Sequence, residues 1–378
     1  MALTRILLLG AGKIGAAITH LLDLTGDYAV TVADATESAL GRIAESTRVR
    51  RQALDVADAA ALSAAMSGHD AVISALPYYL NVGVAERARE AGLHYFDLTE
   101  DVETTRRIRQ LAASAETSFT PQCGLAPGFI SIVTHHLCRR FESLRDVRMR
   151  VGALPEYPTN ALKYNLTWST DGLINEYCNP CEAIHDGALR ELLPLEGLER
   201  FSLDGIDYEA FNTSGGLGTL CETYAGKVRA LDYKTVRYPG HRDILKILLE
   251  DLNLREHRDI LKSVLEAAVP MTAQDVVLVF VTVTGMQAGF LTQETYARKI
   301  YAQEIGGRRW SAIQLTTAAG VCAMVDLHAR GLLPRRGFVK QEDASFDAFI
   351  ANRIGRYYHG EVPTADSARK ESRATANA

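Results

Sequence analysis

The chain has 378 residues, of which 41 are Lys or Arg and 46 are Asp or Glu, so its formal net charge is −5. This balance carries no signature of nucleic-acid binding, and a hydrophobic content of 47% is ample for one large divided domain or two domains. No apolar run approaches the ~20 residues that span a bilayer, and the apolar N-terminal run leads directly into a glycine motif. We therefore expect a cytoplasmic protein that has neither a nucleic-acid nor a membrane partner.

The first predicted elements are a strand, a tight turn and a helix in residues 5–15, RILLLGAGKIG. Gly10 permits the turn, Gly12 allows close approach of a pyrophosphate, and Gly15 lets the helix sit against the strand. The helix N-terminus then offers free N–H groups to the anion. A second strand ends in Asp34, nineteen positions after Gly15. This combination predicts a dinucleotide site rather than a glycine-rich turn without a ligand.

The acid at the end of the second strand indicates which dinucleotide binds. Asp34 would accept hydrogen bonds from the adenosine ribose, and its charge would repel the extra phosphate of NADP. No Arg directly follows it, so the sequence favours NAD as the cofactor. Arg48, Arg50 and Arg51, on or near the third strand, could still reach a phosphate.

Strands and helices continue to alternate up to about residue 122. We expect a helix at 35–46, a third strand at 49–56, and three more strand–helix units that complete six parallel strands. Ligands of such a sheet bind beyond the carboxyl ends of its strands. The residues expected at this edge, beside the three glycines and Asp34, are Lys13, Ile14, Asp55, Val56, Ser74, Ala75, Leu76, Pro77, Leu125, Ala126, Pro127 and Gly128.

From about Leu144 the pattern changes to short alternating segments with turn signals, which predicts an antiparallel sheet. Two helical inserts begin with the same letters, HRDILK, and a long apolar helix follows Trp310 and is expected to return to the first domain. The predicted fold is α/β, a Rossmann-type doubly wound parallel sheet with an inserted α+β domain for substrate binding and dimerisation. The predicted boundaries are 1–128 for the dinucleotide-binding domain, 129–305 for the α+β domain, 306–360 for a C-terminal helical segment and 361–378 for a flexible tail.

Six cysteines in a chain of this size do not form a disulfide framework. Cys178 and Cys181 form a CxxC pair, but no second pair or closely spaced His pair completes a tetrahedral zinc site. We expect reduced thiols and no metal.

Several motifs resemble the saccharopine dehydrogenase-like family: GAGKIG with Asp34, ISALPY, CGLAPGF, YNLTWSTDGLINEY, TSGGLGTL and RYPGH. Within that family the chain is most similar to the lysine 6-dehydrogenases. The resemblance implies a homodimer formed largely through the inserted domain. It also implies an enzyme that uses NAD to deaminate the ε-amine of L-lysine oxidatively. The product would be the 6-semialdehyde, which cyclises to Δ1-piperideine-6-carboxylate, with release of ammonia and NADH.

Candidate substrate contacts come from polar and aromatic residues that the motifs place in the cleft. Arg237 could form a bidentate pair with the substrate carboxylate, and His241 could take the amine proton. Each has an ordinary structural alternative, a salt bridge for Arg237 and a helix cap for His241. Asp97, and beyond it Glu222, are alternative bases. The residues expected to shape the pocket are Tyr78, Cys123, Tyr164, Trp168, Asp171 and Asn175, of which Trp168 could equally be core.

The ε-amine must be neutral to release hydride, whereas a free lysine amine has a pKa of ~10.4, so we expect an alkaline rate optimum. Two other functions remain open. A saccharopine or carboxyalkyl-polyamine dehydrogenase would need a second carboxylate-binding cluster or an acidic trough, which the sequence does not assign. A non-catalytic NAD(H)-sensing protein would not need the polar and aromatic set in residues 164–175.

Overall fold

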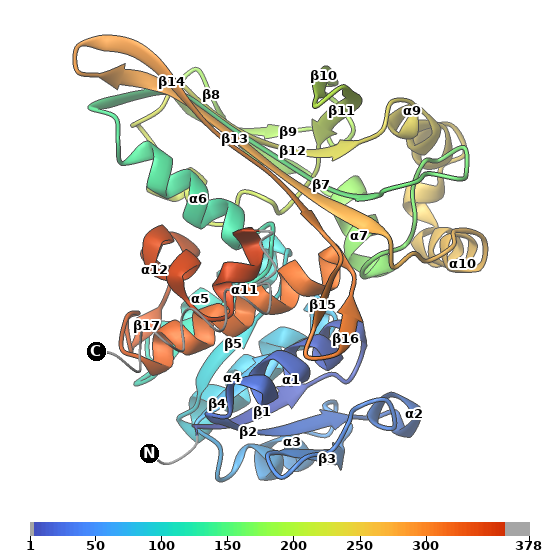
Figure 1. Cartoon of the computed structure of the whole chain (residues 1–378), viewed down its shortest axis with the longest axis vertical. Coiled ribbons are helices and arrows are strands. Elements are labelled where there is room, and N and C mark those ends of the chain that lie inside the picture. Colours follow the sequence, from blue (N-terminus) through green and yellow to red (C-terminus); the bar gives the residue numbers. More distant parts are fainter. Residues whose placement is uncertain (1–3, 360–378) are drawn as a thin grey trace.

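The computed structural model describes residues 4–359, so the tail predicted at 361–378 lies outside it. The two larger β-sheets form separate layers: a parallel sheet built mainly from the N-terminal part of the chain, and a mixed sheet built from its middle part (Figure 1). This arrangement confirms the predicted fold class of a Rossmann-type sheet with an inserted α+β region.

The parallel sheet has the doubly wound strand order β17-β6-β5-β4-β1-β2-β3 in residues 4–359. The seventh strand, which the sequence analysis missed, has two residues and comes from the C-terminal segment, so it adds an edge that no local pattern reveals. The bounds are β1 Thr4–Leu9, β2 Tyr28–Asp34, β3 Val49–Ala53, β4 Ala71–Ser74, β5 His94–Asp97, β6 Ser118–Thr120 and β17 Gly337–Phe338.

Helices connect these strands much as the alternating pattern predicts. The exception is the helix expected at 35–46, which ends after four residues because Gly41, a poor helix former, follows it directly. The bounds are α1 Lys13–Thr25, α2 Glu37–Leu40, α3 Ala59–Met66, a 3₁₀ turn η1 Tyr78–Leu80, α4 Asn81–Ala91 and α5 Val102–Ala112.

The second sheet is mixed rather than purely antiparallel, which corrects the prediction. Its path is β10-β11-β12-β7-β13-β14, and β12 runs parallel to β7. Local alternation reports which side chains are buried but not the direction of a partner about 80 residues away. The strands are β7 Ser143–Pro155, β8 Cys181–His185, β9 Ala188–Leu192, β10 Glu199–Leu203, β11 Ile206–Asn212, β12 Ala230–Arg237, β13 Asp275–Gln287 and β14 Phe290–Tyr301.

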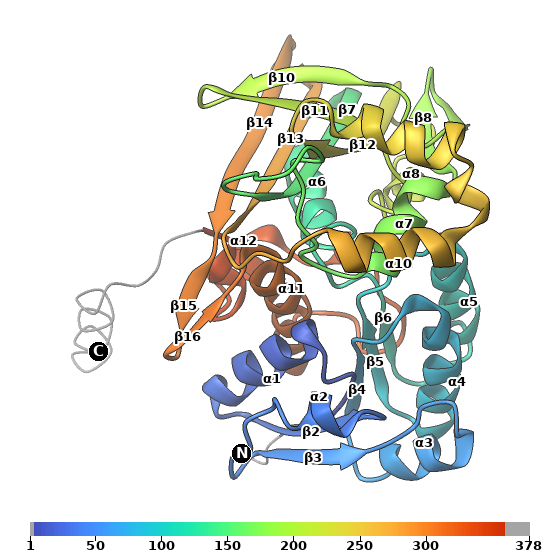
Figure 2. The same ribbon diagram turned by 90° about the vertical axis from the view of Figure 1, so that its right-hand side faces the viewer.

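Several helices of the inserted region lie between this sheet and the parallel sheet (Figure 2). The first HRDILK segment continues into a π-helical turn, and the second forms a longer α-helix, so the shared letters do not produce a structural repeat. The bounds are α6 Phe129–Cys138, α7 Thr170–Cys178, α8 Leu220–Thr223, α9 His241–Lys246, η2 Ile247–Asp251, η3 Leu254–Glu256 and α10 Arg258–Ala268.

The helix α11, Ala312–Ala329, packs against both layers, with contacts to α1 and to β13. It is long and apolar enough to cross a membrane by length and composition, but 83% of it is buried inside the protein. Its first turn donates hydrogen bonds from the Ala312 and Ile313 amides to Asp275, the first residue of β13. The C-terminal elements are β15 Gln303–Ile305, β16 Arg308–Trp310, η4 Gln341–Asp343, α12 Phe346–Ala351 and η5 Gly355–His359.

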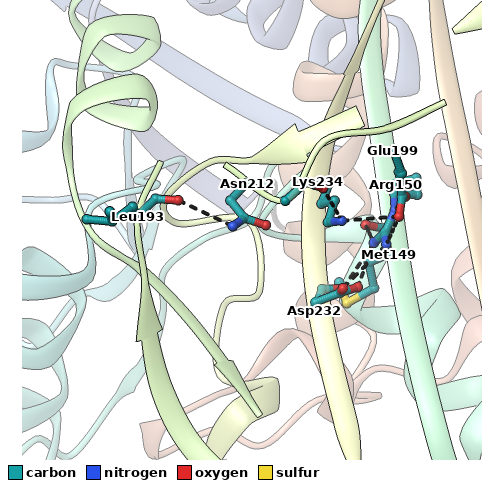
Figure 3. Close-up of polar contacts among 8 residues, drawn as sticks. Met149, Arg150, Leu193, Glu199, Asn212, Asp232 and Lys234 are labelled. Carbon is teal, nitrogen blue, oxygen red and sulfur yellow. Dashed lines mark hydrogen bonds and ion pairs between the residues drawn. The ribbon is translucent and has the colours of Figure 1, made fainter. Parts of the chain in front are cut away.

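An ionic cluster around the buried guanidinium of Arg150 links β7, β12 and the first residue of β10 (Figure 3). The side chain of Arg150 on β7 is 3% exposed and forms ion pairs with Glu199 and Asp232. Lys234 donates to Glu199 at 3.1 Å. Two cations and two carboxylates therefore compensate one another, which offsets the cost of removing these charges from water.

Candidate active site

The glycine loop has the geometry of a dinucleotide site. Gly10 has φ +100°, and a Cβ there would lie 2.8 Å from the Ala75 oxygen; a Cβ on Gly15 would lie 1.9 Å from the Gly10 oxygen. Both positions are therefore glycine for packing and backbone reasons. A Cβ on Gly12 would meet no protein atom within 4 Å. The open space beside Gly12 at the N-terminus of α1 is where a pyrophosphate fits.

Asp34 lies at the carboxyl end of β2, next to this loop. Its carboxylate accepts hydrogen bonds from the backbone N–H of Ala11 and of Thr36, each at 2.8 Å. These bonds fix the acid beside the glycine loop, where a ribose would lie. Neither Asp34 nor Thr36 is followed by an Arg in the turn that leads into α2.

A cavity of about 310 Å³ opens beyond the carboxyl edge of the parallel sheet. One wall comes from the ends of β4 and β5 and from the CGLAPG loop, and the other comes from β7, α7 and β12 of the inserted region. It thus joins a cofactor-side wall to a substrate-side wall. The predicted site residues that line it are Ile14, Ala75, Leu76, Pro77, Tyr78, Leu125, Ala126, Pro127, Trp168, Asp171 and Arg237.

Other predicted cofactor residues lie at the same sheet edge but do not line this cavity. The Ser74 hydroxyl donates to Asn81 at 2.6 Å, and Asp55 accepts from the Ala57 N–H at 2.9 Å. Val56 packs against the apolar layer on the outer side of the parallel sheet, and the Lys13 amine lies 2.9 Å from the sulfur of Met271.

The CGLAPG loop, residues 123–128, is tightly folded. Gly128 has φ +133°, and a Cβ there would lie 2.0 Å from the Gly124 oxygen. Gly320 on α11 lets that helix lie against the loop, since a Cβ at Gly320 would lie 2.6 Å from the Cys123 oxygen. The Cys123 thiol, expected in the pocket, is instead buried behind it. It donates to the Thr120 oxygen at 3.0 Å, and burial raises its pKa.

Arg237 supplies the positive charge of the substrate-side wall. Its side chain lies against the Tyr164 ring, with the guanidinium carbon 4.9 Å from the ring centre, so Tyr164 supports Arg237 rather than lining the cavity. The guanidinium donates to the Tyr177 hydroxyl and to the Val236 oxygen, each at 2.9 Å. Nη2 has no hydrogen-bond partner in residues 4–359 and is available to a ligand carboxylate.

Two carboxyl groups that the sequence analysis missed, Glu100 and Glu176, line the same cavity. Neither side chain has a hydrogen bond or an ion pair with another described residue. Burial raises the pKa of Glu100 to about 7, helped by the neighbouring Asp101, Asp97 and Asp171. Burial also raises the pKa of Glu176 to about 8, although Arg237 acts in the opposite direction. Both groups therefore titrate near neutral pH.

The third acid of the cavity, Asp171, differs from the two glutamates because it forms an ion pair. It lies in the first turn of α7 and pairs with Lys262 of α10 at 2.7 Å. Both side chains of this pair are more than a third exposed. The charge of Asp171 is thus partly neutralised by Lys262, whereas Glu100 and Glu176 are available to bind a cation.

The structure argues against His241 as the catalytic base. Its ring is buried outside the cavity, with Nδ1 2.8 Å from the Leu162 oxygen and Nε2 3.1 Å from the Tyr177 hydroxyl. Burial and the nearby Arg237 lower its pKa to about 3. His241 is therefore a neutral ring that positions Tyr177, which in turn binds Arg237.

The structure gives the other candidate bases structural roles as well. Asp97 is buried and accepts hydrogen bonds from the Tyr95 hydroxyl at 2.7 Å and from the Gln122 N–H at 2.9 Å, which join the ends of β5 and β6. Glu222 forms an ion pair with Arg109 outside the cavity. Asn175, predicted to touch substrate, points away and donates to Asp101 at 3.5 Å.

Some of the missed residues had a signal in the sequence. Tyr233 and Thr235 precede Arg237 at intervals of two on β12, so all three share one face of the strand, and all three line the cavity. Glu100 follows a strand whose carboxyl end was already expected at the ligand edge. Glu176 gave no such signal, because its burial depends on the packing of α7 against the mixed sheet.

The glycine loop, the doubly wound sheet and the cavity beyond its carboxyl edge place the protein in the class with a Rossmann-type dinucleotide-binding domain. Residues 6–120 match the model of the saccharopine dehydrogenase NADP binding domain. Residues 124–356 match the model of the saccharopine dehydrogenase C-terminal domain. The chain therefore belongs to the saccharopine dehydrogenase family, as the resemblance predicted.

Individual relatives are distant. The chain is 27% identical over 197 residues to the NADP-dependent, L-glutamate-forming saccharopine dehydrogenase of Schizosaccharomyces pombe, with 50% of this chain and 43% of the relative covered. It is 25% identical over 261 residues to the enzyme of the same name from Pyricularia oryzae, covering 66% of this chain and 58% of the relative. The chain thus spans about half the length of these relatives.

Solved structures show the same fold. Apo saccharopine dehydrogenase (L-Glu forming) from Saccharomyces cerevisiae superposes with a TM-score of 0.75 at 18% identity, covering 95% of this chain and 97% of the other. A C. glutamicum DAP dehydrogenase in complex with DAP has a TM-score of 0.50 at 11% identity, with 96% of this chain and 100% of the other covered.

Proposed function

We propose that this protein uses NAD to oxidise the side-chain amine of L-lysine, releasing ammonia and NADH and leaving the 6-semialdehyde, which cyclises to Δ1-piperideine-6-carboxylate. The observation that supports this most is the charge composition of the cavity, in which one guanidinium faces three carboxyl groups. L-Lysine carries one carboxylate and two amines, so its charges complement this set.

Arg237 and Glu176 suit the α-amino-acid end of lysine. They come from β12 and α7, both line the cavity, and each affects the charge state of the other without an ion pair within 4 Å among the described residues. Because Arg237 and Glu176 do not form an ion pair with each other, Arg237 can bind the α-carboxylate of lysine while Glu176 binds the adjacent α-ammonium. The side chain then extends toward the CGLAPG loop.

The same composition bears on the alternatives. Saccharopine carries three carboxylates, whereas Arg237 is the single cationic residue among the described cavity-lining residues. The cavity therefore favours lysine, although the matched relatives are named for saccharopine. A carboxyalkyl-polyamine, with one carboxylate and several amines, also matches the surplus of acids and is the second candidate. A non-catalytic NAD(H) sensor would not need this arrangement of buried charges.

The cofactor proposal rests on Asp34 and on the space beside Gly12. The glycine loop and the first turn of α1 would hold the pyrophosphate, Asp34 the ribose, and residues 75–77 and 124–127 the nicotinamide end. The bound nicotinamide would accept the hydride. Cytoplasmic localisation and a homodimer are further proposals; fractionation and sedimentation of the purified protein test them.

The test is NADH formation by the purified protein with NAD and L-lysine at alkaline pH, beside saccharopine, a carboxyalkyl-polyamine, ornithine and a control without substrate. Lysine-dependent NADH with equimolar ammonia is expected. Turnover of saccharopine with release of glutamate or lysine would instead keep the family and overturn the substrate. NADH binding without any turnover would favour the sensor. A rate that is flat from neutral to strongly alkaline pH would also contradict amine oxidation, because the ammonium must lose its proton first.

A further inference from the structure

Glu100 stands on the cofactor side of the cavity. It follows β5 by three residues and shares a wall with Leu98, residues 75–77 and the CGLAPG loop. Glu176 stands on the substrate side with Tyr233 and Arg237. The two carboxyl groups thus lie on opposite walls of the cavity. This arrangement matches L-lysine, which has its two amines at opposite ends.

Packing holds Glu100 in this place. A Cβ on Gly215 would lie 2.4 Å from the Glu100 oxygen, and a Cβ on Gly172 would lie 3.1 Å from Oε1 of Glu100. The TSGGLG loop therefore presses on the Glu100 backbone, and the first turns of α7 approach its carboxyl group. Glycines at both positions leave room for the carboxyl group inside the cavity without a protein hydrogen bond.

The charges around Glu100 are predominantly acidic. Asp97 and Asp101 come from its own segment, Asp171 and Glu176 from α7, and the Tyr78 hydroxyl from η1. Lys262 of α10 is paired with Asp171 at 2.7 Å. Such surroundings favour the uncharged carboxyl form and would stabilise a cation placed beside it.

We propose that Glu100 is the general base that accepts the proton of the reacting ammonium, with Glu176 restricted to the α-ammonium. This inference rests on the proposed oxidation of a primary amine. The R–CH₂–NH₃⁺ group would give one proton to the Glu100 carboxylate and become R–CH₂–NH₂. The nitrogen lone pair then forms C=N as the carbon loses hydride, which bound NAD⁺ would accept, giving R–CH=NH₂⁺. Addition of water and departure of ammonium (NH₄⁺) give the aldehyde, and the proton on Glu100 passes to solvent.

The first test needs no turnover: affinities of NAD⁺ and NADH are measured by titration calorimetry from pH 5.5 to 8.5. If Glu100 faces the positively charged nicotinamide ring, NAD⁺ affinity should rise about tenfold as the carboxylate forms, which corresponds to a shift of about one pKa unit. NADH affinity should change much less. Glu100→Gln should abolish the difference, whereas Glu103→Gln, at an exposed position on α5, should keep it. Equal pH dependence in wild type and Glu100→Gln would overturn the proposal.

The second test uses whichever amine the wild-type protein oxidises, so failure of the lysine proposal does not hide failure of this one. Glu100→Gln should lower kcat about 10²- to 10⁴-fold and remove the acidic limb of the kcat–pH profile. Glu100→Asp should restore part of kcat and the limb. Glu176→Gln should mainly raise KM. Retention of the limb in a folded Glu100→Gln protein, or its loss only in Glu176→Gln, would refute the assignment.

Discussion

Replacing Arg237 by Lys tests whether this residue binds the substrate carboxylate or is only structural. Lys keeps the positive charge but cannot present Nη2 to a carboxylate while donating to Tyr177 and the Val236 oxygen. The loss of one charge-assisted hydrogen bond is about 2 kcal/mol, so KM for lysine should rise about 30-fold.

The assay is the comparison of kcat/KM for lysine and for 1,5-diaminopentane, which keeps both amines and lacks the carboxylate. Wild type should prefer lysine strongly, and Arg237→Lys should lose most of this preference because only lysine uses the guanidinium. Affinity for NADH should remain unchanged, since the residue lies on the substrate side of the cavity. If Arg237→Lys lowers kcat/KM for lysine and for 1,5-diaminopentane by the same factor, Arg237 acts through the fold and the proposed carboxylate contact is refuted.

Three further predictions concern the cofactor and stability. Asp34→Ala should weaken NAD binding more than NADP binding, because it removes the ribose acceptor and the repulsion of the phosphate; equal losses in calorimetry would contradict the NAD assignment. Arg150→Met should lower the free energy of unfolding in urea by about 1–3 kcal/mol, because Asp232 and Glu199 lose a shared partner but stay 29% and 35% exposed, and Glu199 keeps its pair with Lys234; the exposed Arg148→Met should change it little. Burial lowers the pKa of His328 from 6.5 to about 4, so the stability that its neutral ring contributes is complete above pH 6.5. This stability, up to about 3 kcal/mol, is lost as the pH falls toward 4. His328→Gln should therefore flatten the fall in the free energy of unfolding between pH 6.5 and 4, and an unchanged fall would assign it to other groups.

The parallel sheet was predictable because its signals are local. A short apolar run, glycines at fixed spacing and an acid at the end of the next strand each specify one turn of backbone, and no distant contact is needed to identify them. The same reasoning failed for β17, whose two residues pair with β6 only because α11 brings the C-terminal segment back. It also failed for the direction of β12, since alternation is the same in parallel and antiparallel strands.

The site shows a corresponding division. Residues next to the glycine loop and at the ends of β4 and β6 line the cavity as their positions suggested. Histidine was the expected base because its unperturbed pKa lies near neutral pH, but that value describes water. Burial beside a guanidinium lowers the pKa of His241 to about 3, and burial among acids raises the pKa of Glu100 to about 7. Sequence shows which groups can titrate, whereas the fold decides at which pH they do so.

In the proposed reaction, the two glutamates would let one cavity hold a doubly cationic substrate and still take a proton from one end of it. Arg237 and the α-ammonium would together favour the carboxylate form of Glu176, whose pKa burial raises to about 8. Burial and the neighbouring Asp101, Asp97 and Asp171 raise the pKa of Glu100 to about 7, so its carboxylate is present at alkaline pH and could accept a proton from the reacting ammonium. In this proposal the two residues differ in their neighbours: Glu176 shares its wall with the guanidinium of Arg237, and Glu100 shares its wall with residues 75–77 on the cofactor side.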